Sequence, residues 1–132
     1  MKTRKLVTAL FSFFIISVTS YSQSDITIYN YIGDQFSVKG LWVEPGNPSN
    51  YFEYGEENVS FPYVVPYDCL ADPDLKLVKV TINAYCSFSD IAVHYVGTSN
   101  TDALDDCGGC QIGAFSVYDS SIDEIHLLCR DY

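Results

Sequence analysis

The sequence predicts an all-β fold: an antiparallel β-sandwich of the immunoglobulin-like or jelly-roll-like kind, with about seven or eight short strands and stabilising disulfides. Three observations predict it. Several segments alternate apolar and polar residues with the period of two that a half-buried strand requires, and none keeps a helical period for three turns. Turn-forming residues recur at intervals of about ten residues. Five cysteines all follow an N-terminal export segment, and disulfides persist outside the cytoplasm.

The N-terminal segment has the features of a secretory signal peptide at 1–22. Three of the first five residues are basic, and the apolar run at 6–18 is too short for a comfortable membrane span. Ser20 and Ser22 supply the small side chains that a cleavage site needs. We therefore expect a single exported domain at 23–132 that is secreted, periplasmic or at the cell surface, with no membrane span after cleavage.

The exported chain is strongly acidic. Cleavage removes three basic residues, which leaves 7 − 3 = 4 against 17 acidic residues and a net charge of 4 − 17 = −13. We expect neither nucleic acid nor an anionic membrane surface as a partner, because lysine and arginine are what bind both. The negative charge instead favours solubility, and it favours binding of cationic proteins and of calcium.

The first strand is expected at 25–31. Ile26 and Ile28 fall on one side of it, and Tyr29 and Tyr31 fall on the other, outward side. The second is expected at 36–44 and ends at the Pro-Gly pair that follows. Its core face carries Phe36, Val38 and Trp42, with Gly40 in register as an expected β-bulge.

The middle of the chain predicts edge structure followed by a core strand. Residues 47–58 mix turn formers with aromatics, which indicates a loop or short edge strand. The segment 59–67 is expected at a sheet edge, because Pro62 and Pro66 cannot donate to a ladder. The strongest strand follows at 75–88. Its expected core face consists of Val78, Val80, Ile82, Ala84, Cys86 and Phe88.

Three further segments complete the chain. In 90–97, Ile91, Val93 and Tyr95 are expected on one side, which leaves His94 exposed on the other; His126 is likewise expected to be an exposed strand histidine. The polar stretch 98–106 is expected to hold a short helical turn. Residues 111–132 are expected to form a closing hairpin. One face of its last strand carries Ile125, Leu127 and Cys129.

The motif Cys107-Gly-Gly-Cys110 predicts a structural bridge rather than a redox or zinc centre. A thioredoxin-like thiol lies at a helix N-terminus, whereas Asp105 and Asp106 directly precede Cys107 and would raise its pKa. A zinc site needs a second ligand pair, and the other cysteines and both histidines are scattered singly. The two glycines favour a tight turn that either closes a local disulfide or directs the sulfurs to different partners.

Two bridges and one unpaired thiol are expected from the five cysteines, and the sequence leaves fifteen connectivities open. We favour Cys86 with Cys129, because both are assigned to core faces. Cys69 then pairs with Cys107 or Cys110, or those two close on each other. The fifth thiol is expected to be either buried and inert or an intermolecular handle.

Other site chemistry is weakly indicated. Asp102, Asp105 and Asp106 form the acidic cluster that we would assign to calcium, although its spacing is not that of an EF-hand, and solvated loop carboxylates are the simpler interpretation. No hydrolase motif of the G-x-S-x-G or H-E-x-x-H kind is present. We therefore predict no enzymatic activity and no required cofactor.

Aromatic residues are the strongest functional indication. Exposed tyrosine suits protein interfaces and sugar stacking, although such rings also cover sheets and corners in small sandwiches. The expected patch comprises Tyr29, Tyr31, Tyr51, Phe52, Tyr54, Tyr63 and Tyr67.

The signal segment ending in "SYSQ" and the acidic, tyrosine-rich β-chain behind it resemble the small exported proteins of Bacteroidota. That resemblance implies an exported protein and transfers no functional residue. The sequence supports three hypotheses in order. The first is a non-catalytic interaction module, a cell-surface or envelope accessory protein or a subunit of an extracellular assembly, with a protein partner or self-association. The second is a carbohydrate-binding module that binds a glycan through Tyr51, Phe52 and Tyr54, assisted by calcium. The third is a thiol-disulfide oxidoreductase.

Overall fold

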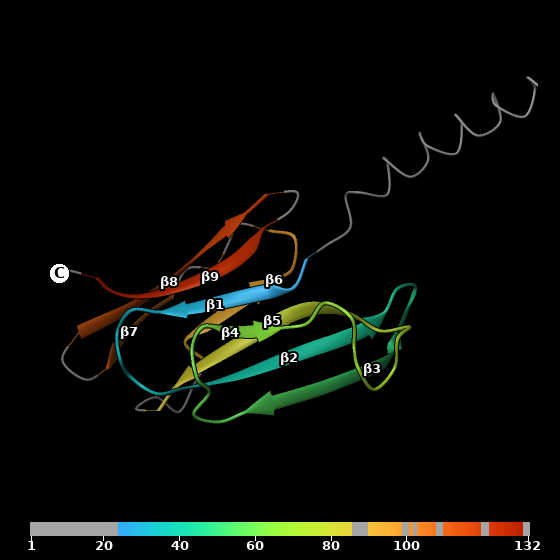
Figure 1. Cartoon of the computed structure of the whole chain (residues 1–132), viewed down its shortest axis with the longest axis horizontal. Coiled ribbons are helices and arrows are strands. Elements are labelled where there is room, and N and C mark those ends of the chain that lie inside the picture. The colour runs from blue at the N-terminus through green and yellow to red at the C-terminus, as the bar shows by residue number, and fades with distance from the viewer. Residues whose placement is uncertain are drawn as a thin grey trace, which may run out of the picture.

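The computed structural model describes residues 24–85, 90–98, 101, 103–107, 110–119 and 122–130, without the side chains of 103–107, 110 and 130. Within them lie nine β-strands: β1 (Ile26–Asn30), β2 (Phe36–Glu44), β3 (Asn47–Glu56), β4 (Tyr63–Val65), β5 (Lys76–Ala84), β6 (Ala92–Tyr95), β7 (Ala103–Cys107), β8 (Cys110–Tyr118) and β9 (Asp123–Arg130). They form a five-stranded sheet in the order β4-β1-β9-β8-β7 and a four-stranded sheet in the order β3-β2-β5-β6 (Figure 1). The prediction of an all-β sandwich is confirmed.

One strand pair departs from the antiparallel prediction. The N-terminal strand β1 runs parallel to the C-terminal strand β9, with Ile28 opposite Ile125, whereas every other pairing of the described strands is antiparallel. The larger sheet is therefore mixed. Within it β1 and β9, the first and the last of the described strands, are neighbours (Figure 1). This strand order also differs from that of the two sheets in constant-type immunoglobulin domains.

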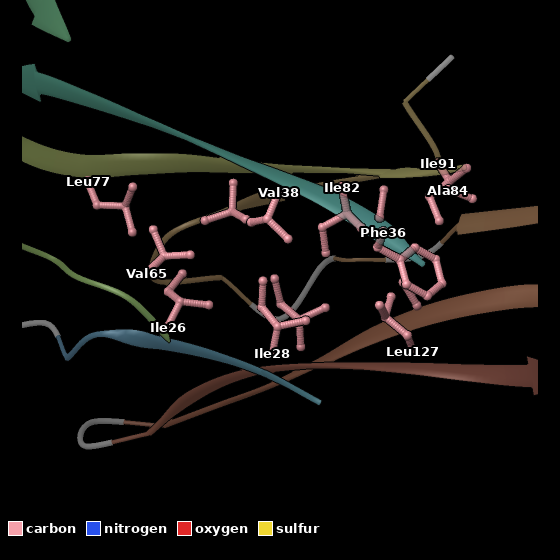
Figure 2. Packing of buried hydrophobic residues seen from close by; sticks show 14 of the residues in the cluster. Ile26, Ile28, Phe36, Val38, Val65, Leu77, Ile82, Ala84, Ile91 and Leu127 are labelled. Atoms are coloured by element: carbon pink, nitrogen blue, oxygen red, sulfur yellow. The ribbon is translucent and has the colours of Figure 1, made fainter. Parts of the chain in front are cut away.

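The core lies between the two sheets. Figure 2 shows Ile26, Ile28 and Leu127 of the larger sheet facing Phe36, Val38 and Ile82 of the smaller one. Each of these six side chains is at most 2% exposed. Both faces were predicted from the period-two alternation. The burial of β1, of β2 and of Ile125 and Leu127 in β9 confirms them, but Cys129, predicted on the same face of β9, is exposed.

The core face of β5 differs from the prediction. Val80, Ile82 and Ala84 are buried as expected, but Leu77 is buried in place of Val78, which is 38% exposed. The pairing explains the change: Lys79 lies opposite Leu41 and Leu77 lies opposite Trp42, so one residue of β5 is left over. This bulge reverses the alternation at Val78, and it lies in β5 rather than at Gly40 as the sequence suggested.

The two predicted edge segments lie at sheet edges. β3 borders the smaller sheet, and at ten residues it is an edge strand longer than the short one expected. β4 borders the larger sheet and is three residues long, in the segment flanked by Pro62 and Pro66. Residues 103–107 form the strand β7 rather than the predicted helical turn, because they pair with β8 throughout.

The alternation in β6 is the reverse of the prediction. Ala92 and His94 are buried and Tyr95 is 57% exposed, so His94 lies in the interior. Ile91 is also buried, but it precedes the strand and bonds through its amide to the carbonyl of Ile82, 2.9 Å away. Counting alternate residues from Ile91 therefore assigned the wrong face to His94.

The cysteines are described in part. Cys69 is free and 4% exposed, so its predicted alternative pairing with Cys107 or Cys110 is wrong. Cys129 is disulfide-bonded, and its partner is not among the described side chains. The favoured pairing with Cys86 stays a prediction because Cys86 lies outside the described residues. Cys107 and Cys110 are register partners across β7 and β8.

Candidate functional site

The two sheets leave a groove open between their edge strands β3 and β4. A cavity of about 410 Å³ lies there. Its walls come from the inward face of β3, from β4, and from the loop 69–71. Leu70 in this loop is 92% exposed at the cavity, where it extends the apolar surface formed by Phe52, Trp42 and Val65.

The floor of the groove is built on β2. Trp42 lies across Gly40, two residues before it in the strand, and its indole Nε1 donates a hydrogen bond to the carbonyl of Pro66, 2.9 Å away. A Cβ atom on Gly40 would lie 2.6 Å from Cη2 of the Trp42 ring. Gly40 is therefore required by the close approach of the ring, as in strands where an aromatic side chain covers a glycine.

We expect Gly40→Ala to displace the Trp42 ring and to lower the free energy of unfolding by about 1–3 kcal/mol, the usual cost of overpacking. Trp42 is the single tryptophan, so its fluorescence reports the displacement directly. Gly55→Ala on the exposed strand β3 is the matched control, because the added Cβ atom would lie 3.1 Å from Lys39 Cβ and 3.2 Å from the Val38 carbonyl oxygen, and Trp42 is not among its nearest neighbours. Equal fluorescence spectra for Gly40→Ala and the wild type would contradict this assignment.

A carboxylate and two phenols lie at the mouth of the groove. Glu56 accepts hydrogen bonds from the hydroxyls of Tyr54 at 3.1 Å and Tyr63 at 3.3 Å, which connects β3 to β4. The hydrogen bond to Glu56 and then its negative charge raise the pKa of Tyr54. The pKa of Tyr63 is raised first by burial and then by the charge of Glu56. Both phenols thus stay protonated and donate to the carboxylate.

Glu56→Gln should lower the pKa of both tyrosines, and that of Tyr54 more, because Glu56 is the main cause only there. The folded state holds these protons more tightly than the unfolded state does. The stabilisation from the contact is therefore complete below the ordinary tyrosine pKa of about 10 and is lost as the pH rises through the folded pKa values. Phenolate absorbance measured against pH, with Glu57→Gln as control, tests this. Equal titration curves for Glu56→Gln and the wild type would contradict it.

A second polar constellation is buried between the sheets. His94 Nε2 lies 2.9 Å from Asp123 Oδ1, and His94 Nδ1 bonds to the hydroxyl of Thr101. The other Asp123 oxygen accepts the amide of Gly97 at 3.3 Å. A hydroxyl, an imidazole and a carboxylate in series are also the parts of a hydrolytic triad, but the three residues are at most 3% exposed. The arrangement is that of a satisfied buried network that links β6 to β9.

Aromatic rings also stack on the outer face of the larger sheet. His126 lies between Tyr29 at 5.0 Å and Phe115 at 5.2 Å, and these three are direct register partners on adjacent strands. Tyr31 stacks on His126 from 5.8 Å, and Glu124 bonds to the imidazole at 3.1 Å. His126 thus faces outward as predicted, but the rings cover it.

The predicted aromatic patch is not a single site. Phe52, Tyr54 and Tyr63 line the groove. Tyr51 projects from the opposite face of β3, since strand neighbours alternate. The remaining members lie elsewhere: Tyr29 and Tyr31 in the stack of the larger sheet, and Tyr67 packed against the core.

No family model matches the chain. No curated protein and no solved structure matches it either. Groove and network must therefore be interpreted from their own chemistry.

Three further predictions concern metal binding, redox chemistry and membrane spans. Among the described residues no group of three or more histidine, cysteine or acidic residues could hold a metal ion, and the side chains of Asp102, Asp105 and Asp106 lie outside them. Cys107 and Cys110 lie on strands, not at the helix N-terminus that a thioredoxin-like site requires. The part of the chain with described structure contains no helix long and apolar enough to cross a membrane.

The sequence did not connect Glu56 with the aromatic residues of the groove, and it indicated Asp123 only as one of several loop carboxylates, not as a partner of His94. Phe52, Tyr54 and Glu56 alternate along β3 and therefore lie on one face of it. The sequence would have indicated this grouping if residues 47–56 had been predicted as a single strand. Asp123 is 29 positions from His94, and no local pattern indicates that these two residues meet.

Proposed function

We propose that this chain is an exported, non-catalytic interaction module that binds a protein partner in the groove between β3 and β4. The single observation that carries the proposal is an apolar groove of about 410 Å³ that remains open beside the core, with Leu70 exposed at it. Aromatic side chains at a concave site, with a few polar groups for orientation, are what binding sites use. Glu56 and the hydroxyls of Tyr54 and Tyr63 are such groups.

Site-specific photocross-linking tests the proposal. A photoreactive residue at Leu70 should cross-link one defined protein in the native envelope or medium, and Phe52→Ser in the same chain should abolish that product. The matched control places the photoreactive residue at Tyr95, which is 57% exposed on β6 at the opposite edge of the smaller sheet. The same products from both positions, or none from Leu70, would overturn the proposal.

A carbohydrate ligand is the second candidate. The rings of Phe52 and Tyr54 are nearly parallel, with centroids 6.4 Å apart and an interplanar angle of 6°, which supports stacking on successive sugar units. Tyr51 is not part of this platform, contrary to the sequence hypothesis. A glycan array probed with and without calcium should then give signals that Phe52→Ser removes and Tyr51→Ser retains.

We also propose that disulfides stabilise the scaffold and that Cys86 pairs with Cys129. Ala84 and Leu127, each two residues before one of these cysteines, lie close to Phe36 at the same end of the core (Figure 2). A bridge there would fasten the two sheets and stabilise the fold by about 2–4 kcal/mol. Disulfide mapping of the exported protein should find this pair, a Cys107–Cys110 pair and a reduced Cys69; any bridge to Cys69 would contradict it.

A further inference from the structure

We propose that the partner binds by strand addition: an extended segment with alternating apolar and basic residues pairs with the free edge of β3. This inference rests on the proposed function and specifies the occupant of its groove. β3 has ten residues and pairs with β2 on one side. In the described part of the chain no backbone hydrogen bond reaches its other side, and Figure 1 shows it at the border of the smaller sheet.

A strand edge of this length is a template for another strand, since its outward amides and carbonyls lack partners. Ten residues span about 34 Å, enough for six to eight residues of a bound segment. The described side chains of β3 are exposed almost throughout, so no part of the fold needs to move before a strand can pair.

The inward face of β3 specifies the apolar half of the pattern. Phe52 and Tyr54 are 39% and 51% exposed at the groove. Side chains on the inward face of an added strand would lie beside these rings, against Leu70 and over the groove. Burial of that surface favours valine, isoleucine or leucine at alternate positions of the partner.

The outward face of β3 specifies the basic half. Tyr51, 62% exposed, and Glu53, with a side chain 45% exposed, alternate on this face. A lysine or arginine opposite them meets a carboxylate across the strands and an aromatic ring beside it. Lys39 Nζ approaches Glu53 Oε1 at 3.7 Å. Both side chains are about half exposed, so this ion pair contributes little to stability, and Glu53 can also bind a basic residue of the partner.

Charge also argues against a second copy as the occupant. The chain has a net charge of −10, and β3 carries Glu53 and Glu56 with no basic residue. Pairing β3 with β3 of another copy would bring two acidic strands together, which like charges on adjacent strands oppose. The acidic residues therefore favour a basic partner and protect the edge from self-association.

The test uses synthetic peptides and the exported chain with its disulfides intact. A peptide of about eight alternating valine and lysine residues should bind with an affinity on the order of micromolar to tens of micromolar, slow the amide hydrogen exchange of β3 and shift Trp42 fluorescence. The controls are the valine–glutamate peptide and a valine–lysine peptide interrupted by proline, neither of which should bind. Glu53→Lys should weaken binding roughly five- to tenfold, and Tyr95→Ser should leave it unchanged.

Four results would overturn strand addition. A shift in Trp42 fluorescence without protection of β3 would mean that the groove binds in another way, and the proposed function would then stand. Equal binding of the proline-interrupted peptide would lead to the same conclusion. Protection of β3 in a dimer of the free chain would assign the edge to a second copy. Failure of every peptide would also overturn the inference, whereas the proposed function fails separately if Leu70 gives no specific cross-link.

Discussion

Asp123→Ala should lower the free energy of unfolding by about 2–6 kcal/mol, because two groups that bond to this carboxylate would each lose their partner at a cost of about 1–3 kcal/mol. His94 is completely buried and would retain an imidazole nitrogen without its partner, and the amide of Gly97 would lose its acceptor. A domain of this size has only about 5–15 kcal/mol of stability in total, so the variant should be marginal. Equilibrium unfolding in urea, followed by Trp42 fluorescence, measures the loss.

Two substitutions control this experiment. Asp123→Asn keeps an acceptor oxygen and should restore part of the stability. Glu124→Gln alters the next residue, whose bond to His126 lies on the outer face with side chains 28% and 16% exposed, and should cost less than about 1 kcal/mol. A loss from Asp123→Ala no larger than that from Glu124→Gln would show that the network does not hold the sheets together.

Phe36→Ala should cost about 3–5 kcal/mol, the range for truncation of a buried aromatic residue. Phe36 is 1% exposed at the first position of β2 and lies in the core near Leu127 (Figure 2). Its ring packs edge-on against Phe61, with centroids 6.0 Å apart. Phe115→Ala is the matched control, since that ring is 44% exposed on the outer face of the larger sheet. It should cost about 1 kcal/mol through its stack on His126. Equal losses would mean that the core lies elsewhere.

The strands that follow an unbroken alternation were predictable. Ile26, Ile28, Ile125 and Leu127 lie inward as the period of two requires. The prediction failed where a local event shifts that period: the bulge at Val78 reverses the face of the first part of β5. β7 was missed for another reason, because its strand conformation comes from pairing with β8 rather than from its own polar residues.

Only the aromatic composition of the candidate groove was predictable from the sequence. Aromatic residues were expected to mark it, and Phe52, Tyr54 and Tyr63 do line the groove. Which rings share a surface depends on which face of its strand each ring occupies and on how the two sheets pack. Tyr51 lies on the opposite face of β3 and Tyr67 packs against the core, so the prediction grouped both wrongly with Phe52, Tyr54 and Tyr63. The contact of His94 with Asp123 depends on the packing of β6 against β9, which a single sequence does not express.

Amide hydrogen exchange of the free chain at low concentration tests the central claim most directly, namely that β3 is an open edge beside an unfilled groove. The amides of β2, which is paired on both sides, should be strongly protected, whereas the β3 amides that point away from β2 should exchange at nearly the rate of an unstructured peptide. Protection of β3 equal to that of β2 in a monomer would contradict the claim, because some part of the chain would then already occupy the edge.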